Sequence, residues 1–256
     1  MLNLTELQKS IELLIMDSSP PEKHCARSAI KHIKKAWDIR EIDKEMACFR
    51  AITGEEESVS AIFHSLKKRK YFGAEKLKPR NHVHKAAFHP FCIAVSQSLT
   101  MLNEQGREPT IELKEENGIK RFHTRLTMKM PDGHTKWAYP LPPLHYNVKV
   151  NEELHDFSEE LMNIASERNA ADIISVIKKE ANCRNRILYA SDAGIPSIPD
   201  SLDDFLMKKK EVIFLNLIIF LMIDPYHEKQ LFVQQALQAF LKMLNIIDKV
   251  DIEAGW

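Results

Sequence analysis

The sequence has few glycines, few cysteines and no excess of charge of either sign. Its 256 residues include only 7 Gly and 12 Pro, which leaves little room for disordered low-complexity tracts. The four cysteines are far apart and form no CxxC pair, which argues against a disulfide framework or a structural zinc site. Lys and Arg total 36, as do Asp and Glu, so any nucleic-acid binding must come from a local patch.

Long hydrophobic runs are also lacking. The most apolar stretch, residues 212–223, is too short for a bilayer, which needs about 20 residues. The first residues carry no basic region, so they do not read as a signal peptide. We therefore expect a cytoplasmic protein without a membrane partner. A helix that is apolar on all sides must be surrounded, either by its own bundle or by a second copy, and we favour a homodimer.

Common catalytic signatures are absent as well. The chain contains no GxGxxG, GxxxxGK[ST], HExxH or GxSxG pattern, which removes the usual nucleotide, zinc-protease and hydrolase readings. Glu152 and His155 form one ExxH, but a carboxylate-bridged di-iron bundle needs two such motifs. We expect no cofactor and no metal site.

What is present is mostly helical periodicity. Thr5 and Gln8 have the spacing of a capping box, and a stripe of apolar residues at helical spacing follows from residue 26. The pattern predicts a mainly α (α+β) fold: a helical bundle with an inserted three-stranded antiparallel β-meander. We divide the chain into helical segments 1–105 and 151–256, which can pack as one domain, and the meander at 106–150. The expected helices span 5–16, 22–40, 42–70, 81–103, 152–166, 169–182, 201–223 and 225–249.

The meander is predicted from two hairpin signals, Asn-Gly at 117–118 and Asp-Gly at 132–133. Treating each as a two-residue turn places Leu113 opposite Phe122 and Met128 opposite Trp137. This register puts Trp137, with the other apolar side chains of the strands, on the packed face.

The opposite face of the meander is expected to be basic. It would carry Arg121, Arg125, Lys129 and Lys136, with the last two as direct cross-strand neighbours. Like charges opposite each other destabilise a sheet, which makes an anionic partner plausible; an ordinary solvated face is the alternative.

A second basic segment covers residues 67–85, where eight Lys or Arg accompany a single acid, Glu75. Cations track phosphates and aromatic rings stack on unpaired bases, so this segment is a candidate nucleic-acid surface. A solvated helix end is the alternative for its first part. The candidate binding residues are Lys67, Lys68, Arg69, Lys70, Tyr71, Lys76, Lys78 and Lys85.

Histidines lie at the end of this segment, beside Arg80 and Asn81. His82 and His84 could move protons near neutral pH, and an arginine could stabilise the phosphorane formed when a 2′-hydroxyl cleaves RNA. A glutamate from the run 55–57, with Glu56 as the candidate, could orient one of these groups. The alternatives are surface histidines and a solvated acidic face.

Residues 22–95 resemble the helical HEPN-type domains of abortive-infection proteins, especially the V type. The matching pieces are HCARSAIKHIKKAW, then RAITGEEESVSAIF with its glutamate run, a basic linker and RNHVHK at 80–85. The resemblance implies that Arg80 and Asn81 take the places of the family's arginine and adjacent polar residue. The place of the family's histidine holds Lys85, Ala86 and Ala87.

The resemblance implies an RNA-engaging protein, and the activity it implies is that of a metal-independent endoribonuclease of the defence or toxin type. Its catalytic candidates are Arg80, Asn81, His82, His84 and Glu56. The alternative is a non-catalytic interaction protein that binds a protein or nucleic acid through the basic linker and the sheet face.

Overall fold

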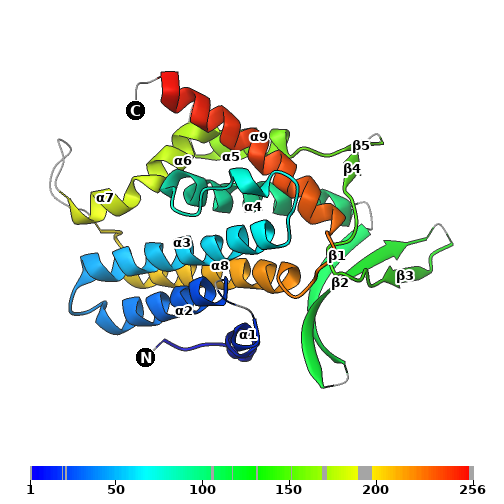
Figure 1. The fold of residues 1–256 in the computed structure, drawn as a ribbon, viewed down its shortest axis with the longest axis horizontal. Helices are drawn as coiled ribbons and strands as arrows, with labels where there is room; N and C mark the ends of the chain where they lie inside the picture. The colour runs from blue at the N-terminus through cyan, green and yellow to red at the C-terminus, as the bar shows by residue number, and fades with distance from the viewer. Residues whose placement is uncertain are drawn as a thin grey trace. The chain divides into compact units, whose positions relative to one another are not determined.

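The computed structural model describes residues 2–18, 20, 22–104, 107–116, 118–130, 132–150, 152–168, 172–189 and 198–253 (Figure 1). The chain forms two compact units, each assembled from segments that are distant in sequence. Unit 1 comprises residues 1–65, 78–86 and 177–221, and unit 2 comprises 66–77, 87–176 and 222–256. The fold is mainly helical with a small antiparallel sheet, as the sequence predicted.

Unit 1 is built from helices. It contains α1 (Glu6–Met16), α2 (Glu22–Ile39), most of α3 (Lys44–Lys68), the start of α4 (His82–Glu104), α7 (Cys183–Leu188) and most of α8 (Leu202–Ile223). The predicted capping box is confirmed: Thr5 Oγ1 accepts the N–H of Gln8, and Gln8 Oε1 accepts the N–H of Thr5.

Gly54 of α3 lies close to both α2 and α8 in unit 1. A Cβ atom at this position would lie 3.1 Å from the carbonyl oxygen of Ala29 on α2 and 3.0 Å from Cδ1 of Ile213 on α8. The glycine therefore lets α3 approach α2 closely, and Figure 1 shows these two helices side by side. The core of unit 1 also includes Ile33 and Phe63, both fully buried.

The apolar stretch 212–223 forms the second half of α8. Its side chains are mostly buried, with Ile213, Leu217 and Phe220 at 0% exposure and Leu215 an exception at 42%. The helix is thus surrounded within the chain itself, so its apolar character does not by itself argue for a second copy. No helix among the described residues is both long and apolar enough to cross a membrane.

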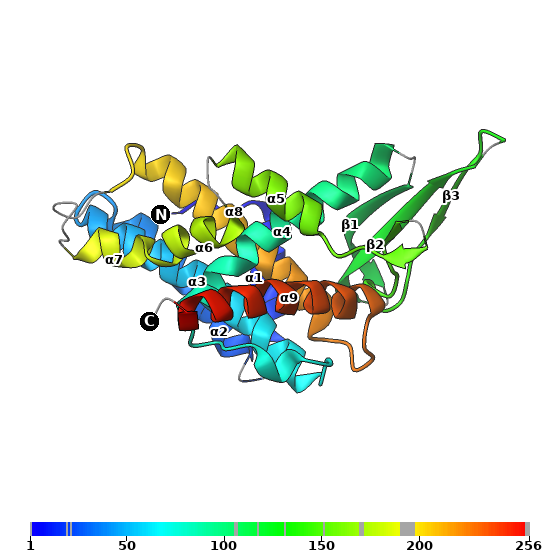
Figure 2. The same ribbon diagram turned by 90° about the horizontal axis from the view of Figure 1, so that it is seen from above.

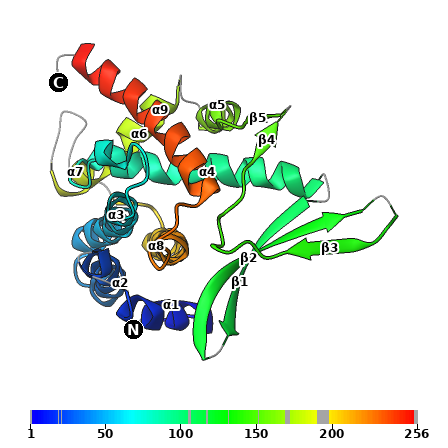
Figure 3. The same ribbon diagram turned by 45° about the vertical axis from the view of Figure 1, so that its right-hand side comes forward.

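Unit 2 combines helices with all of the strands. Its helices are η1 (Ala74–Lys76), most of α4, α5 (Ser158–Glu167), the start of α6 (Ile173–Ala181) and α9 (Leu231–Glu253). Figure 3 shows α9 crossing α4, and aromatic rings fill this contact: the centroids of Phe91 and Phe240 lie 5.2 Å apart, and those of Phe88 and Phe240 5.8 Å apart. Pro90 lies inside α4, which begins eight residues before it.

Two helices begin six residues later than the sequence-based expectation. Where a helix was expected from residue 152, a short hairpin of β4 (Lys149–Val150) and β5 (Glu153–Leu154) is found, and α5 begins at Ser158. Glu152 has a left-handed φ of 66°, which interrupts a helix there. Asn151, which would have capped a helix beginning at residue 152, lies outside the described residues. The last helix begins at Leu231 rather than at 225, because Gln230 is held by Tyr71 and Leu144.

The meander is confirmed. It consists of β1 (Arg107–Glu116), β2 (Ile119–Lys129) and β3 (Thr135–Ala138) in the order β1-β2-β3, and Figure 2 shows the three strands together. The register across the first turn is the expected one, with Leu113 opposite Phe122.

The register predicted across the second turn is wrong by one residue. In the structure Trp137 lies opposite Thr127, and Lys136 lies opposite Met128. The N–H of Met130 donates to the carbonyl of His134 at 2.8 Å, so three residues rather than two separate the last paired positions. Gly133 supplies the left-handed φ of 84° that a three-residue hairpin loop requires. Because side chains alternate between faces, this shift moves every β3 side chain to the face opposite the expected one.

The corrected register predicts that Trp137→Ala has little effect on stability. Trp137 is 63% exposed, whereas Phe122, on the other face, is 3% exposed. We expect Trp137→Ala to change the free energy of unfolding by about 0.5 kcal/mol or less, measured by urea denaturation. Phe122→Ala, the control, should cost several times more. A loss for Trp137→Ala as large as that for Phe122→Ala would reject this register.

Candidate functional site

The site forms at the start of α4 in unit 1. Asn81 caps this helix: its Oδ1 accepts the N–H groups of Val83 at 2.8 Å and His84 at 3.2 Å. Such a cap fixes the first turn by satisfying backbone donors that have no partner within the helix. His82 and Lys85, three residues apart on the turn that follows, therefore lie on one side of α4.

Glu56 on α3 joins these two side chains. Its Oε1 lies 2.7 Å from Nδ1 of His82, and its Oε2 accepts a hydrogen bond from Nζ of Lys85 at 3.0 Å. The Glu56 and Lys85 side chains are 12% and 7% exposed, whereas His82 is 46% exposed. The buried carboxylate of Glu56, which contacts both His82 and Lys85, thus holds the imidazole in place while the ring remains accessible.

Arg184 on α7 approaches the other side of the imidazole. Its Nη1 lies 3.3 Å from Nε2 of His82, and its guanidinium carbon lies 4.4 Å from the centre of the Phe49 ring. Stacking on an aromatic ring orients a guanidinium group without using its hydrogen-bond donors. Nothing in the local sequence around Arg184 indicates this role, since it lies 102 positions from His82.

The arrangement suits acid–base chemistry on a phosphate. With its Nδ1–H directed at Glu56, a neutral imidazole turns its Nε2 lone pair towards Nη1 of Arg184, which can only donate. A substrate hydroxyl that replaces this contact can give its proton to Nε2. Arg184 supplies positive charge at the same place, where an anionic substrate would bind. Among the residues that the structure describes, no cluster of three or more His, Cys, Asp or Glu could hold a metal ion.

The three glutamates of α3 point to different partners. Glu55 forms an ion pair with Lys209 on α8, Glu56 contacts His82, and Glu57 lies near Cys25 on α2. Burial, reinforced by the charges of Glu57 and Glu22, raises the pKa of the Cys25 thiol to about 11. Cys25 is therefore protonated at neutral pH and is not an activated nucleophile.

The remaining catalytic candidates do not join the site equally. Arg80 is exposed and forms no ion pair with any residue that the structure describes, so it is available to an external anion. His84 is 2% exposed, which removes it from contact with a substrate at the surface. His82 and Glu56 are thus the candidates that the structure brings together.

The basic segment does not form one continuous surface within a unit. Lys67, Lys68, Arg69, Lys70 and Lys76 belong to unit 2, whereas Lys78, Arg80 and Lys85 belong to unit 1. Lys68, Lys70, Lys76 and Lys78 are exposed.

Two members of the segment have structural partners instead. Arg69 donates to the carbonyl oxygen of Asp224 and lies 2.9 Å from Nδ1 of His227. Tyr71 is 2% exposed, and its hydroxyl accepts the N–H of Gln230 at 3.0 Å. Burial leaves the Tyr71 ring no free face on which a base could stack.

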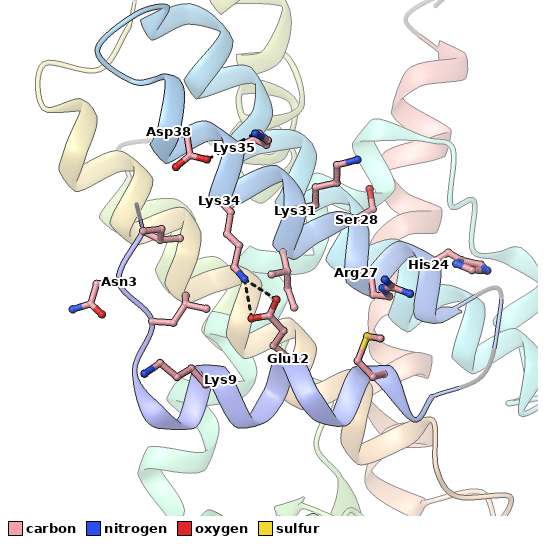
Figure 4. Close-up of a pocket in the computed structure, with 14 residues that line it drawn as sticks. Asn3, Lys9, Glu12, His24, Arg27, Ser28, Lys31, Lys34, Lys35 and Asp38 are labelled. Carbon is pink, nitrogen blue, oxygen red and sulfur yellow. Dashed lines mark hydrogen bonds and ion pairs between the residues drawn. The ribbon is translucent and has the colours of Figure 1, made fainter.

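A further basic groove lies between α1 and α2, with a volume of about 970 Å³ (Figure 4). Arg27, Lys31 and Lys34 line it from α2, and Lys34 is neutralised by Glu12 of α1 at 2.6 Å. Sequence reasoning missed this groove, although basic residues recur on α2 at helical spacing.

Comparisons with known proteins add no relative: no family model, no curated protein and no solved structure matches the chain. The function must therefore be argued from the geometry of the site.

Proposed function

We propose that the protein is an HEPN-like, RNA-engaging protein that cleaves RNA without a metal ion, with His82 as the proton acceptor. The observation that carries the proposal is the position of the His82 ring between the carboxylate of Glu56 and the guanidinium of Arg184. A defence role, a cytoplasmic location and a homodimer belong to the same proposal through the resemblance of residues 22–95 to the HEPN type.

The reaction is attack of a ribose 2′-hydroxyl on the adjacent phosphorus. Nε2 of His82 takes the hydroxyl proton, the bond from phosphorus to the 5′-oxygen breaks, and water protonates the departing oxygen. The products are a 2′,3′-cyclic phosphate and a 5′-hydroxyl. Arg184 and the exposed Arg80 stabilise the negative charge on the phosphorane. Such electrostatic stabilisation is usually the largest single contribution to catalysis. Asn81 keeps the first turn of α4 in place.

The test is RNA cleavage in the presence of EDTA by the wild type and by His82→Gln. General acid–base catalysis contributes about 10²–10⁴-fold, so His82→Gln should lower the rate by at least about 100-fold. His134, which is exposed in the second turn of the meander, provides the control variant His134→Gln. Thermal unfolding followed by circular dichroism checks that each variant folds.

Two results would contradict the proposal: loss of wild-type cleavage on adding EDTA, or equal rates for the wild type and His82→Gln. RNA binding without any cleavage would favour the alternative of a non-catalytic interaction protein. Analytical ultracentrifugation tests the homodimer separately.

A further inference from the structure

The shifted register gives one face of the sheet in unit 2 an unexpected composition. In an antiparallel pair, residues opposite each other project from the same face. Trp137 is opposite Thr127, so it lies on the face of β2 that also carries Arg125 and Lys129. Lys114 is opposite Arg121 and therefore belongs to this face as well.

Tyr139, directly after β3, reaches the same face. Nζ of Lys114 lies 3.4 Å from the centre of the Tyr139 ring. The contact with Tyr139, more than the nearby Glu112, raises the pKa of Lys114, so this lysine is positively charged at neutral pH. Trp137 is 63% exposed and Tyr139 39% exposed. Two aromatic rings thus lie uncovered beside cations.

This face carries four cations. Among the side chains that the structure describes there, the cations are Lys114, Arg121, Arg125 and Lys129, and the carboxylate is Glu112. Glu112 lies 2.7 Å from Arg125 and 3.4 Å from Lys114. By the register, Glu108 and Glu116 also belong to this face, so four cations stand against three carboxylates. Arg121 and Lys129 form no ion pair with any side chain that the structure describes, so these two cations are available to a phosphate.

We propose that this aromatic–basic face, defined by Lys114, Arg121, Arg125, Lys129, Trp137 and Tyr139, binds single-stranded RNA. Exposed aromatic rings stack on unpaired bases irrespective of sequence, and cations beside them contact the phosphates. Alternate residues of a strand are about 7 Å apart, so Trp137 and Tyr139 can each stack on a separate base. Lysine is depleted at the centre of protein–protein interfaces, whereas the phosphates of a nucleic-acid strand can meet both the lysines and the arginines, so RNA is the better fit.

The inference rests on the proposed function only for the choice of RNA, because binding here does not require His82. Its test uses a labelled 2′-O-methyl RNA of about 12 nucleotides, within the range such surfaces cover. This oligonucleotide has no free 2′-hydroxyl and cannot be cleaved by the proposed reaction. Binding is therefore measured whether or not the protein cuts RNA.

Variants of Trp137 separate stacking from simple burial of apolar surface. Trp137→Leu should weaken binding by at least about fivefold, measured by fluorescence anisotropy, whereas Trp137→Phe should stay within about twofold of the wild type. Binding should quench tryptophan fluorescence in the wild type and much less in Trp137→Phe. Equal affinity of Trp137→Leu and the wild type would overturn the proposal.

Lys129 and Lys136 provide a matched pair on opposite faces of the sheet, and both are exposed. Lys129→Gln should reduce the slope of log affinity against log salt by about 0.7, the value for one phosphate contact with a single strand. Lys136→Gln should leave the slope unchanged. Equal effects of the two, or equal binding of the wild type to duplex and single-stranded RNA, would reject this face. Cleavage that persists in Trp137→Leu while binding is unchanged would reject the face alone, not the proposed reaction.

Discussion

Replacing Phe157 by alanine is expected to lower the free energy of unfolding by about 3–5 kcal/mol. The Phe157 side chain is fully buried in unit 2. Its ring meets Phe91 edge to face at 5.8 Å between centroids and His155 at 4.9 Å. Loss of the ring removes these contacts and leaves a cavity, because close-packed surroundings relax only in part. Urea denaturation of both proteins measures the difference.

The backbone at Phe157 allows a sharper test. Its φ of 61° lies in the left-handed region, where a Cβ atom is unfavourable and glycine is not penalised. Phe157→Gly should therefore destabilise less than Phe157→Ala, by about 1 kcal/mol. Met162→Ala, at a 66% exposed position of α5, is the control and should have little effect. A greater loss for glycine than for alanine would contradict the conformational argument.

The second large effect concerns the ion pair between Glu55 and Lys209. These side chains are 13% and 18% exposed, so both charges are largely removed from water. Burial lowers the pKa of Lys209, but the charge and hydrogen bond of Glu55 outweigh it, and the net pKa is raised. Lys209→Met would leave Glu55 without its partner and should cost about 3–5 kcal/mol.

Removing both charges should cost much less than removing one. The double variant Glu55→Leu/Lys209→Met replaces a buried pair by apolar groups, which is often close to neutral. The measurements belong at pH 7. Because the pKa of Lys209 is raised on folding, its contribution to stability is fully present below the pKa that it has in the unfolded chain. That contribution is lost as the pH rises through the pKa that Lys209 has in the folded protein. Lys208→Met, at the exposed neighbouring position, is the control. Additive losses in the double variant would show that the pair does not interact.

The sequence predicted most of the helices and the meander because their signals are local, whereas α7 was not predicted. A capping box at Thr5 and Gln8, apolar residues at helical spacing, and Asn-Gly and Asp-Gly pairs each act within a few residues. These interactions do not depend on tertiary contacts. The helix expected at 152 is wrong for the opposite reason: Gln235 of α9, a partner distant in sequence, donates to the backbone carbonyls of Val148 and His155.

The register of β3 could not be read from the sequence. An Asp-Gly pair fits both a two-residue turn and a three-residue loop with glycine in the left-handed conformation. The two possibilities differ by one residue, and one residue exchanges the faces of Trp137 and Lys136. The structure decided between a buried tryptophan and one exposed beside cations.

For the candidate site, the sequence by itself determined a set of residue types: a glutamate run, histidines and an arginine near the start of a helix. Successive residues of a helix point about 100° apart, so only packing of α3 could decide that Glu56, rather than Glu55 or Glu57, contacts His82. Arg184 reaches His82 from 102 positions away, through a contact between α7 and α4 that no local pattern encodes. Local interactions determine which elements form, whereas the pairing of distant side chains depends on how those elements pack, and that is settled only in the folded chain.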